Sequence, residues 1–265
     1  MTEDRVIIRI EDGIAEVTLN RPEKLNAFDA PMFEAVAAAG ARLMEEPGLR
    51  AVVLTGAGRA FCAGIDTAML MEFAADLDTL RQEIVTPPRG QAANRFQQPC
   101  TVWADLPVPV IAALHGVTFG AGMQLALGAD LRIAAKDTQL SIMETRWGLI
   151  PDMGLTKLLP GVMRADQALD MILSARVIEG PEAQELGLVT RVAEDPLAAA
   201  RDTARAIAAR SPEAVRGAKE LVRAAWPGDD QHLALEARLQ AAIIGSANQM
   251  EAVMAGMQKR APKFS

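Results

Sequence analysis

The sequence is poor in cysteine, in metal-ligand clusters and in positive charge, and each shortage excludes a class of protein. Its two cysteines, Cys62 and Cys100, are too few for a disulfide framework or a cysteine-based zinc site. No group of histidine, cysteine and acidic residues has the spacing of metal ligands, so we expect no metal. The 34 acidic residues outnumber the 27 lysines and arginines, and the formal net charge of −7 disfavours nonspecific binding to nucleic acids or anionic membranes.

Long apolar runs are also missing. No run approaches the ~18–20 residues that cross a bilayer, and residues 1–16 lack the apolar segment of a signal peptide. We therefore expect a cytoplasmic protein without a membrane anchor, a location that also suits two unpaired cysteines. Half of the 265 residues are apolar and 23% are charged, which is the balance of a globular protein of one or two domains.

The order of the predicted elements indicates a mixed α/β protein. Residues 5–11 and 14–20 are strand-like on either side of Asp12-Gly13, which predicts a β-hairpin. Asp29 is a suitable N-cap for a helix that ends before Pro47. Further strands are predicted at 51–54, 108–114 and 131–134. Further helices are predicted at 123–128, 165–173, 181–186, 196–210, 212–225, 232–244 and 249–260.

The predicted strands lie in the first part of the chain, and the last part is helical. We therefore divide the chain into a core, residues 1–195, and a helical C-terminal region, residues 196–265. Apolar stripes on the alanine-rich C-terminal helices favour an oligomer. Residues 67–104 are less regular, although Met69–Leu80 has helical spacing. We interpret this stretch as a mobile or ligand-covering segment that shapes a substrate pocket.

Three short stretches carry the chemistry: residues 59–66, 115–125 and 143–152. The first two are glycine-containing and follow predicted strands, and the second opens a helix. Glycine lets the backbone approach a ligand closely, and a helix N-terminus adds free N–H groups and a positive dipole end. Two such junctions can aim two N–H groups at one oxygen, which makes an oxyanion hole. The alternative is that these glycines only serve tight turns.

Five motifs in order resemble the crotonase superfamily, also called the enoyl-CoA hydratase/isomerase family. They are Arg21-Pro22 with Leu25-Asn26-Ala27, Ala60-Phe61-Cys62-Ala63-Gly64 with Asp66, Gly116 with Gly120-Ala121-Gly122, Gly148-Leu149 with Pro151, and Glu182-Ala183 with Gly187-Leu188-Val189. Glu251–Arg260 and Phe264 resemble the family's C-terminal helix and tail. The resemblance covers most of the chain. It implies an α/β spiral core of ββα turns, a helical trimerisation region, and a homotrimer or hexamer.

The resemblance also implies a binding site for an acyl-CoA thioester, with no cofactor beyond the coenzyme A of the substrate. The N–H groups of Ile65 and Ala121 would hold the thioester oxygen, and alanine in place of the family's usual glycine keeps the second donor. Each basic residue of the implied coenzyme A site has the alternative reading of a solvated surface charge. The residues implied for substrate and coenzyme A binding are Lys24, Arg59, Ala60, Ala63, Gly64, Asp66, Gly120, Lys263 and Phe264.

The acid–base residues decide the reaction. Family hydratases carry two glutamates, which align with Gln124 and Glu144 here. Glutamine cannot ionise, so Gln124 moves no proton, although it can position a water or a substrate group. Glu144 is then the candidate base, and the alternative is a surface glutamate or a salt bridge to Arg146. Asp152 matches the second carboxylate of the family's dienoyl-CoA isomerases, and the alternative is a turn or N-cap aspartate.

These residues predict an enzyme that shifts a double bond in an enoyl- or dienoyl-CoA through a thioester enolate. Glu144 would carry the proton, with Asp152 as a second carboxylate. Two other readings stay open: an enoyl-CoA hydratase that adds water across the 2,3 double bond, and a non-catalytic acyl-CoA-binding homologue. The sequence leaves the length and branching of the acyl group undetermined.

Overall fold

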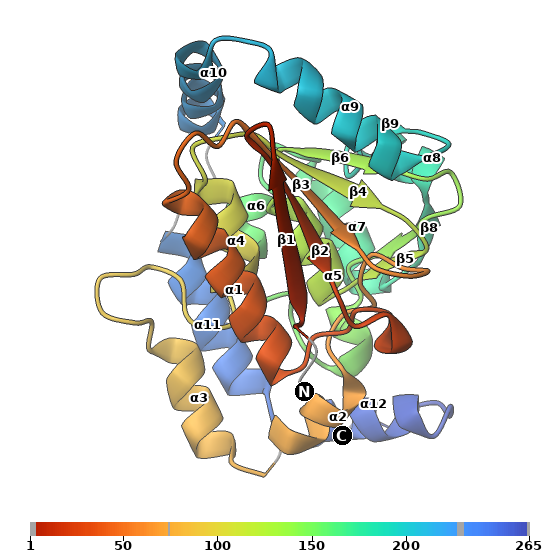
Figure 1. Ribbon diagram of the computed structural model, residues 1–265. Helices are drawn as coiled ribbons and strands as arrows, with labels where there is room; N and C mark the ends of the chain where they lie inside the picture. The colour runs from red at the N-terminus through yellow and green to blue at the C-terminus, as the bar shows by residue number, and fades with distance from the viewer. Residues whose placement is uncertain (1–3, 74, 227–230, 264–265) are drawn as a thin grey trace.

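Two β-sheets form the centre of the molecule, and helices surround them (Figure 1). The computed structural model describes residues 4–73, 75–226 and 231–263. The larger sheet has the order β1-β2-β3-β4-β6-β9, with bounds Val6–Glu11, Ile14–Leu19, Ala51–Gly56, Val110–Leu114, Leu131–Ala134 and Arg191–Val192. The smaller has the order β5-β7-β8, with bounds Val117–Phe119, Gln139–Ser141 and Ile178–Glu179. The sequence did not predict β5, β7, β8 or β9, because strands of two or three residues leave almost no pattern.

The first two strands form the predicted hairpin. β1 and β2 pair antiparallel, and the turn residues Asp12 and Gly13 both have positive φ, as a two-residue turn of the primed type requires. The remaining strands of the larger sheet pair parallel. Parallel strands need connections that cross a face of the sheet, and helices α1 (Ala30–Met44) and α4 (Gln98–Asp105) lie in these connections. The Asp29 side chain accepts a hydrogen bond from the N–H of Met32, which confirms the predicted N-cap.

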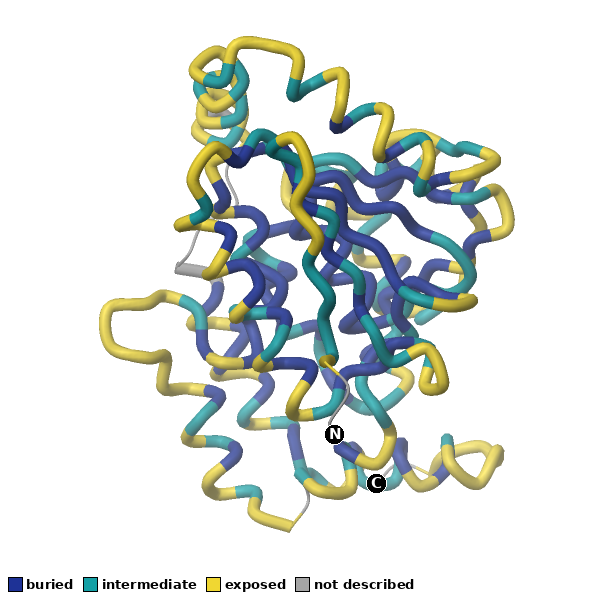
Figure 2. Tube along the Cα trace, in the orientation of Figure 1, coloured by how far each residue is buried: buried dark blue, intermediate teal, exposed yellow. Residues whose placement is uncertain are grey.

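The central strands β3 and β4 are buried on both faces, and successive side chains of each strand point to opposite faces. Val52 and Leu54 join the main core, which also contains side chains of α1, α4 and α5 (Ala121–Leu127). Val53 and Ile111 face the other way and pack with α9 (Pro196–Ala208), which lies across the sheet in Figure 1. The buried trace of Figure 2 follows this sandwich of strands between helices.

The second glycine-rich stretch is more ordered than the sequence predicts. Residues 117–119 form strand β5, and α5 begins at Ala121 rather than at the predicted Met123. Gly122 therefore lies inside a helix, where it permits close packing: a Cβ atom on it would lie 2.5 Å from the carbonyl oxygen of Cys62. The glycine serves the close approach of α5 to the segment around Cys62 and not a turn, and the helix begins two residues earlier than predicted.

The segment 67–104 is largely helical. Instead of the single helix Met69–Leu80, the chain forms α2 (Thr67–Phe73) and α3 (Leu77–Val85), and Asp76 caps the second. The C-terminal helices lie within a few residues of their predicted bounds. They are α7 (Ala165–Ser174), α8 (Gly180–Glu185), α10 (Pro212–Ala225), α11 (Gln231–Ile243) and α12 (Ala247–Met257). Helix α11 packs against α3 and the short α6 (Leu155–Leu158), and thereby reaches the centre of the molecule.

Candidate active site

The segment 62–66 lies between two neighbouring pieces of chain that fix its direction. The N–H of Phe28 donates to Gly64, and the N–H of Asp66 donates to Phe28, each over 2.8 Å. Ile65 is thus the centre of a parallel bridge to Phe28, and its own N–H points to the opposite side. No hydrogen bond to this N–H is found within the described residues. On that opposite side, Cys62 bridges to β5, which leads directly into α5.

The N–H of Ala121 opens α5 and has no acceptor within its own helix. Gly64 lies against this point: a Cβ atom on it would be 3.0 Å from the oxygen of Phe119 and 3.9 Å from the nitrogen of Ala121. Gly64 also has a φ of +100°, which residues with a Cβ rarely adopt. The close approach brings the N–H groups of Ile65 and Ala121 to the same small region.

Glu144 lies beside this region. It begins the 3₁₀ helix η2 (Glu144–Trp147), and a Cβ atom on Gly120 would lie 3.4 Å from its Oε1. The side-chain amide of Gln124 donates to Oε1 of Glu144 over 2.6 Å and accepts from the N–H of Met153 over 2.8 Å. Oε2 of Glu144 is buried and has no hydrogen-bond partner within the described residues. The carboxyl group therefore has one fixed oxygen and one available oxygen.

Burial raises the pKa of Glu144 to about 7, against the smaller opposing effect of its hydrogen bonds. A carboxyl group with this pKa takes and releases a proton readily near neutral pH. Such a pKa, in a buried group next to free N–H donors, is typical of a general base. The alternative of a surface glutamate is wrong, because Glu144 is buried. No salt bridge to Arg146 is found among the described residues.

Asp152 lines a narrow cavity together with Ile65 and Leu149. The volume of the cavity is about 20 Å³. Burial, and then the charges of Glu236 and Glu144, raise the pKa of Asp152 well above its ordinary value. The other lining residues are mostly apolar, and six of them come from the segment 67–104 or from helix α1: Phe33, Leu70, Phe73, Leu80, Ile84 and Phe96.

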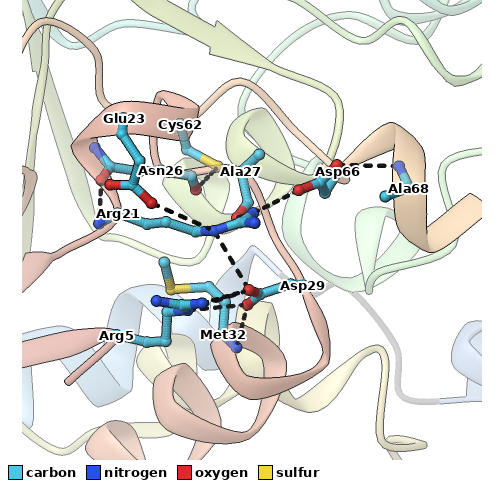
Figure 3. A network of polar contacts seen from close by, with 10 residues as sticks. All are labelled: Arg5, Arg21, Glu23, Asn26, Ala27, Asp29, Met32, Cys62, Asp66 and Ala68. Atoms are coloured by element: carbon cyan, nitrogen blue, oxygen red, sulfur yellow. Dashed lines mark hydrogen bonds and ion pairs between the residues drawn. The ribbon is translucent and has the colours of Figure 1, made fainter. Parts of the chain in front are cut away.

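A network of charged side chains braces the segment that carries Ile65 (Figure 3). Arg21 pairs with Asp66 over 2.7 Å and with Asp29 over 3.3 Å, and Arg5 pairs with Asp29. Burial opposes ionisation of Asp66, but the N–H of Ala68 and the Arg21 guanidinium lower its pKa below the usual value. The network fixes the backbone on which the N–H of Ile65 depends.

Comparison with known proteins identifies the family of this chain. The model of the enoyl-CoA hydratase/isomerase family matches residues 9–265. The chain belongs to the enoyl-CoA hydratase/isomerase family. It is 38% identical over 269 residues to a probable enoyl-CoA hydratase of Rhodobacter capsulatus, covering 100% of this chain and 99% of the relative. It is 31% identical to the peroxisomal Delta(3,5)-Delta(2,4)-dienoyl-CoA isomerase of Arabidopsis thaliana, covering 96% and 94%.

The fold leads to the same family. The crystal structure of a putative enoyl-CoA hydratase from Streptomyces coelicolor has a TM-score of 0.76 and 33% identity, and the match covers 100% of this chain and 96% of that one. These matches confirm the family and the α/β crotonase fold that the motifs predicted. The protein is a crotonase-family enzyme, and the acyl-CoA thioester is the substrate class of the family.

The residues implied for coenzyme A lie in two kinds of place. Ala60 is buried, and Ala63, Gly64, Asp66 and Gly120 belong to the junctions around Ile65 and Ala121. The basic side chains of Lys24, Arg59 and Lys263 are exposed, and the backbone N–H of Lys263 donates to Glu251. Phe264 lies outside the described residues. The side chain of Asp66 forms an ion pair with Arg21, so it supports the backbone beside the N–H group of Ile65.

Two buried polar residues near the crotonase site, Glu236 and Gln240, were missed by the sequence reasoning. Both belong to α11, which the sequence reasoning treated only as part of the oligomerisation region. Gln240 lines the cavity beside Asp152, and Glu236 accepts hydrogen bonds from residues 154 and 156. Polar residues on an otherwise apolar helix face were the one available signal, but they do not specify a partner. Within the described residues, no group of three or more histidine, cysteine or acidic side chains is placed to hold a metal ion.

Proposed function

We propose that the enzyme shifts a double bond along the acyl chain of an enoyl- or dienoyl-CoA thioester. The observation that carries this proposal is the hydrogen bond from Gln124 to Glu144. An amide at position 124 can orient the carboxyl group but supplies no second proton. Double-bond migration moves one proton from carbon to carbon and needs one base that later becomes the acid.

The thioester oxygen binds to the N–H groups of Ile65 and Ala121. Their hydrogen bonds stabilise the negative charge that develops on this oxygen when a proton leaves the neighbouring carbon. Glu144 accepts that proton through its available Oε2, and the carbon–hydrogen electron pair forms the enolate. A proton then returns to a carbon further along the chain, and the double bond moves. The removal of one donor from such a hole typically costs about 3–4 kcal/mol of barrier.

Asp152 is the second proton carrier in this proposal. It lines the same cavity as Ile65, and its raised pKa favours the protonated form. A protonated carboxyl group there can donate to a distant carbon while Glu144 takes the proton next to the thioester. This division of roles suits a dienoyl substrate, whose two reacting carbons lie far apart. The dienoyl-CoA isomerase among the relatives agrees with this substrate class.

Hydration of the 2,3 double bond is the second candidate, favoured by the Rhodobacter relative named as a probable hydratase. Glu144 would then activate water unaided, or Asp152 would replace the glutamate that is absent at position 124. A non-catalytic acyl-CoA-binding homologue is the third candidate. The buried and partly unpartnered carboxyl of Glu144 speaks against it, since such a group is costly unless it serves the chemistry.

A substrate panel separates the three candidates. Purified enzyme is given 3-enoyl-CoA, 3,5-dienoyl-CoA and 2-enoyl-CoA, and kcat/KM is measured for each. We expect faster isomerisation of the first two than hydration of the third. Faster hydration would overturn the isomerase proposal in favour of the hydratase, and binding without turnover would favour the non-catalytic homologue. Asp152→Asn on the dienoyl substrate tests the second carboxylate: a severe loss supports it, and near-normal activity leaves Glu144 as the only proton carrier.

We also propose a cytoplasmic homotrimer or hexamer that needs no cofactor beyond the coenzyme A of its substrate. Large apolar side chains are exposed on the C-terminal helices and favour self-association. They include Leu169, Leu173, Leu221, Val222, Trp226 and Met257. The two buried free cysteines suit a reducing compartment. Within the described residues, no helix is long and apolar enough to cross a bilayer. Light scattering of the purified protein measures the oligomeric state.

A further inference from the structure

Helix α11 holds the turn that carries Asp152 from both sides. The side chains of Glu236 and Gln240 are one helical turn apart, and both are buried. Gln240 accepts a hydrogen bond from the N–H of Ile150 over 3.2 Å, and Glu236 accepts one from the N–H of Gly154 over 2.9 Å. The two donors lie two residues before and two residues after Asp152. The backbone around Asp152 is thereby attached to α11 at both ends.

Glu236 makes more contacts than this attachment alone requires. Besides Gly154, it accepts hydrogen bonds from the N–H and the hydroxyl of Thr156 and from the side-chain amide of Gln97. All four partners donate, so they favour the ionised carboxylate over the protonated form. No lysine or arginine pairs with Glu236 within the described residues. Burial nevertheless raises the pKa of Glu236 above its ordinary value, because these hydrogen bonds lower it only in part. A buried carboxyl group without a basic partner among the described residues therefore lies beside the Asp152 turn.

Two carboxyl groups and one thiol are the titratable groups that interact with Asp152. Glu236 comes from α11, Glu144 from η2 and the thiol of Cys100 from α4. Two carboxylates close together disfavour ionisation of a third. The same helix thus supplies the geometry of the Asp152 turn, through two hydrogen bonds, and part of the field that keeps the Asp152 carboxyl protonated.

We propose that Glu236 and Gln240 are positioning residues for proton transfer, which hold the Asp152 turn so that its carboxyl group faces the acyl cavity and remains the proton donor. This inference rests on the proposed function, because it takes Asp152 as the second proton carrier. Neither residue touches the reacting carbons in this role. Both act through Asp152.

The test compares Glu236→Gln and Gln240→Met with the unchanged enzyme on 3,5-dienoyl-CoA. Both variants should lower kcat by about 10-fold or more with little change in KM, because a small displacement of a proton donor is costly. Only Glu236→Gln removes a titratable carboxyl group. It should therefore also shift the fall in rate at high pH, which reports the ionisation of Asp152, to lower pH. Gln240→Met should leave this part of the pH–rate profile unchanged. Glu220→Gln, on the exposed side of α10, is the matched control and should change neither quantity.

A direct readout is the ¹³C NMR titration of the Asp152 carboxyl, assigned with Asp152→Asn. Its midpoint should fall in Glu236→Gln. An unchanged midpoint with unchanged kcat would overturn the inference, provided that Asp152→Asn is itself severe. Near-normal activity of Asp152→Asn would instead overturn the proposed second proton carrier, and this inference with it. If Glu236→Gln does not fold, Gln240→Met decides the question. A lower kcat supports the positioning role, and an unchanged kcat overturns it.

Discussion

Gln124 and Glu144 are joined by a 2.6 Å hydrogen bond in which the amide nitrogen of Gln124 donates to Oε1 of Glu144. The same amide accepts from the N–H of Met153, so its orientation is fixed from the other end. In family hydratases, by resemblance, a glutamate stands where Gln124 does. A neutral amide at this position leaves Glu144 as the one titratable group of the pair and leaves its Oε2 available.

Glu144→Gln should abolish turnover while binding of the CoA thioester persists. Glutamine keeps the shape of the side chain and can still accept from Gln124, but it cannot accept a proton from carbon. General acid–base catalysis by one side chain contributes typically about 10²–10⁴-fold, and Gln124 cannot replace it. Steady-state kinetics and calorimetric binding of a substrate analogue measure the two effects. If most of the activity survives on every enoyl-CoA tested, the base is Asp152 or another residue.

The kcat/KM of the enzyme should rise with pH and reach half of its upper value at a pH of about 7. Glu144 must be ionised to act as a base, and burial raises its pKa to about 7, so the protonated and inactive form dominates below that pH. A pH–rate profile on 3-enoyl-CoA measures the midpoint. A midpoint near 4.5, the ordinary glutamate value, would contradict the buried position assigned to the carboxyl.

Glu144→Gln should stabilise the folded protein at alkaline pH. The pKa of Glu144 is about 7 when folded and near its ordinary value of 4.5 when unfolded. The stability linked to its protonation is therefore fully present below pH 4.5 and is lost as the pH rises through about 7. Glutamine does not ionise, so the variant should gain about 3 kcal/mol over the unchanged protein at high pH and little at low pH.

Urea unfolding at low and high pH measures this difference. Glu220→Gln, which removes the same charge from an exposed position on α10, should show no such dependence on pH. Equal stability of Glu144→Gln and the unchanged protein across the whole range would mean that the buried carboxyl carries no ionisation penalty.

Gln124→Glu should raise the rate of hydration relative to isomerisation. The new carboxyl would lie within hydrogen-bond distance of Glu144, and two carboxyl groups at such a distance share a proton. A proton carrier would then stand directly beside Glu144, the arrangement of the two glutamates in family hydratases by resemblance. The ratio of 2-enoyl-CoA hydration to 3-enoyl-CoA isomerisation measures the change. Gln124→Met, which is neutral, is the control, and an equal ratio in both variants would contradict the role given to position 124.

Much of the local structure was predictable from the sequence. The hairpin at Asp12-Gly13 and the N-cap at Asp29 depend on residues a few positions apart, and both are confirmed. The motifs around Ile65 and Ala121 predicted the family, because they record which backbone must approach the substrate closely. The short strands were not predicted because two or three residues leave almost no pattern. The helical spacing of the apolar residues in 69–80 concealed the break between α2 and α3.

The electrostatic arrangement of the site is a product of the tertiary structure. Glu144 alone is an ordinary glutamate in the sequence, and only its burial against Gln124 raises its pKa. Glu236 reaches Gly154 across 82 residues of chain, and no local pattern specifies that partner. The sequence by itself determined most of the longer elements, because these follow from short-range hydrogen bonding and apolar periodicity, and its ordered motifs determined the family and the residue types available for proton transfer. Packing decided which of those residues meet, because burial and the fields of distant charges exist only in the folded chain.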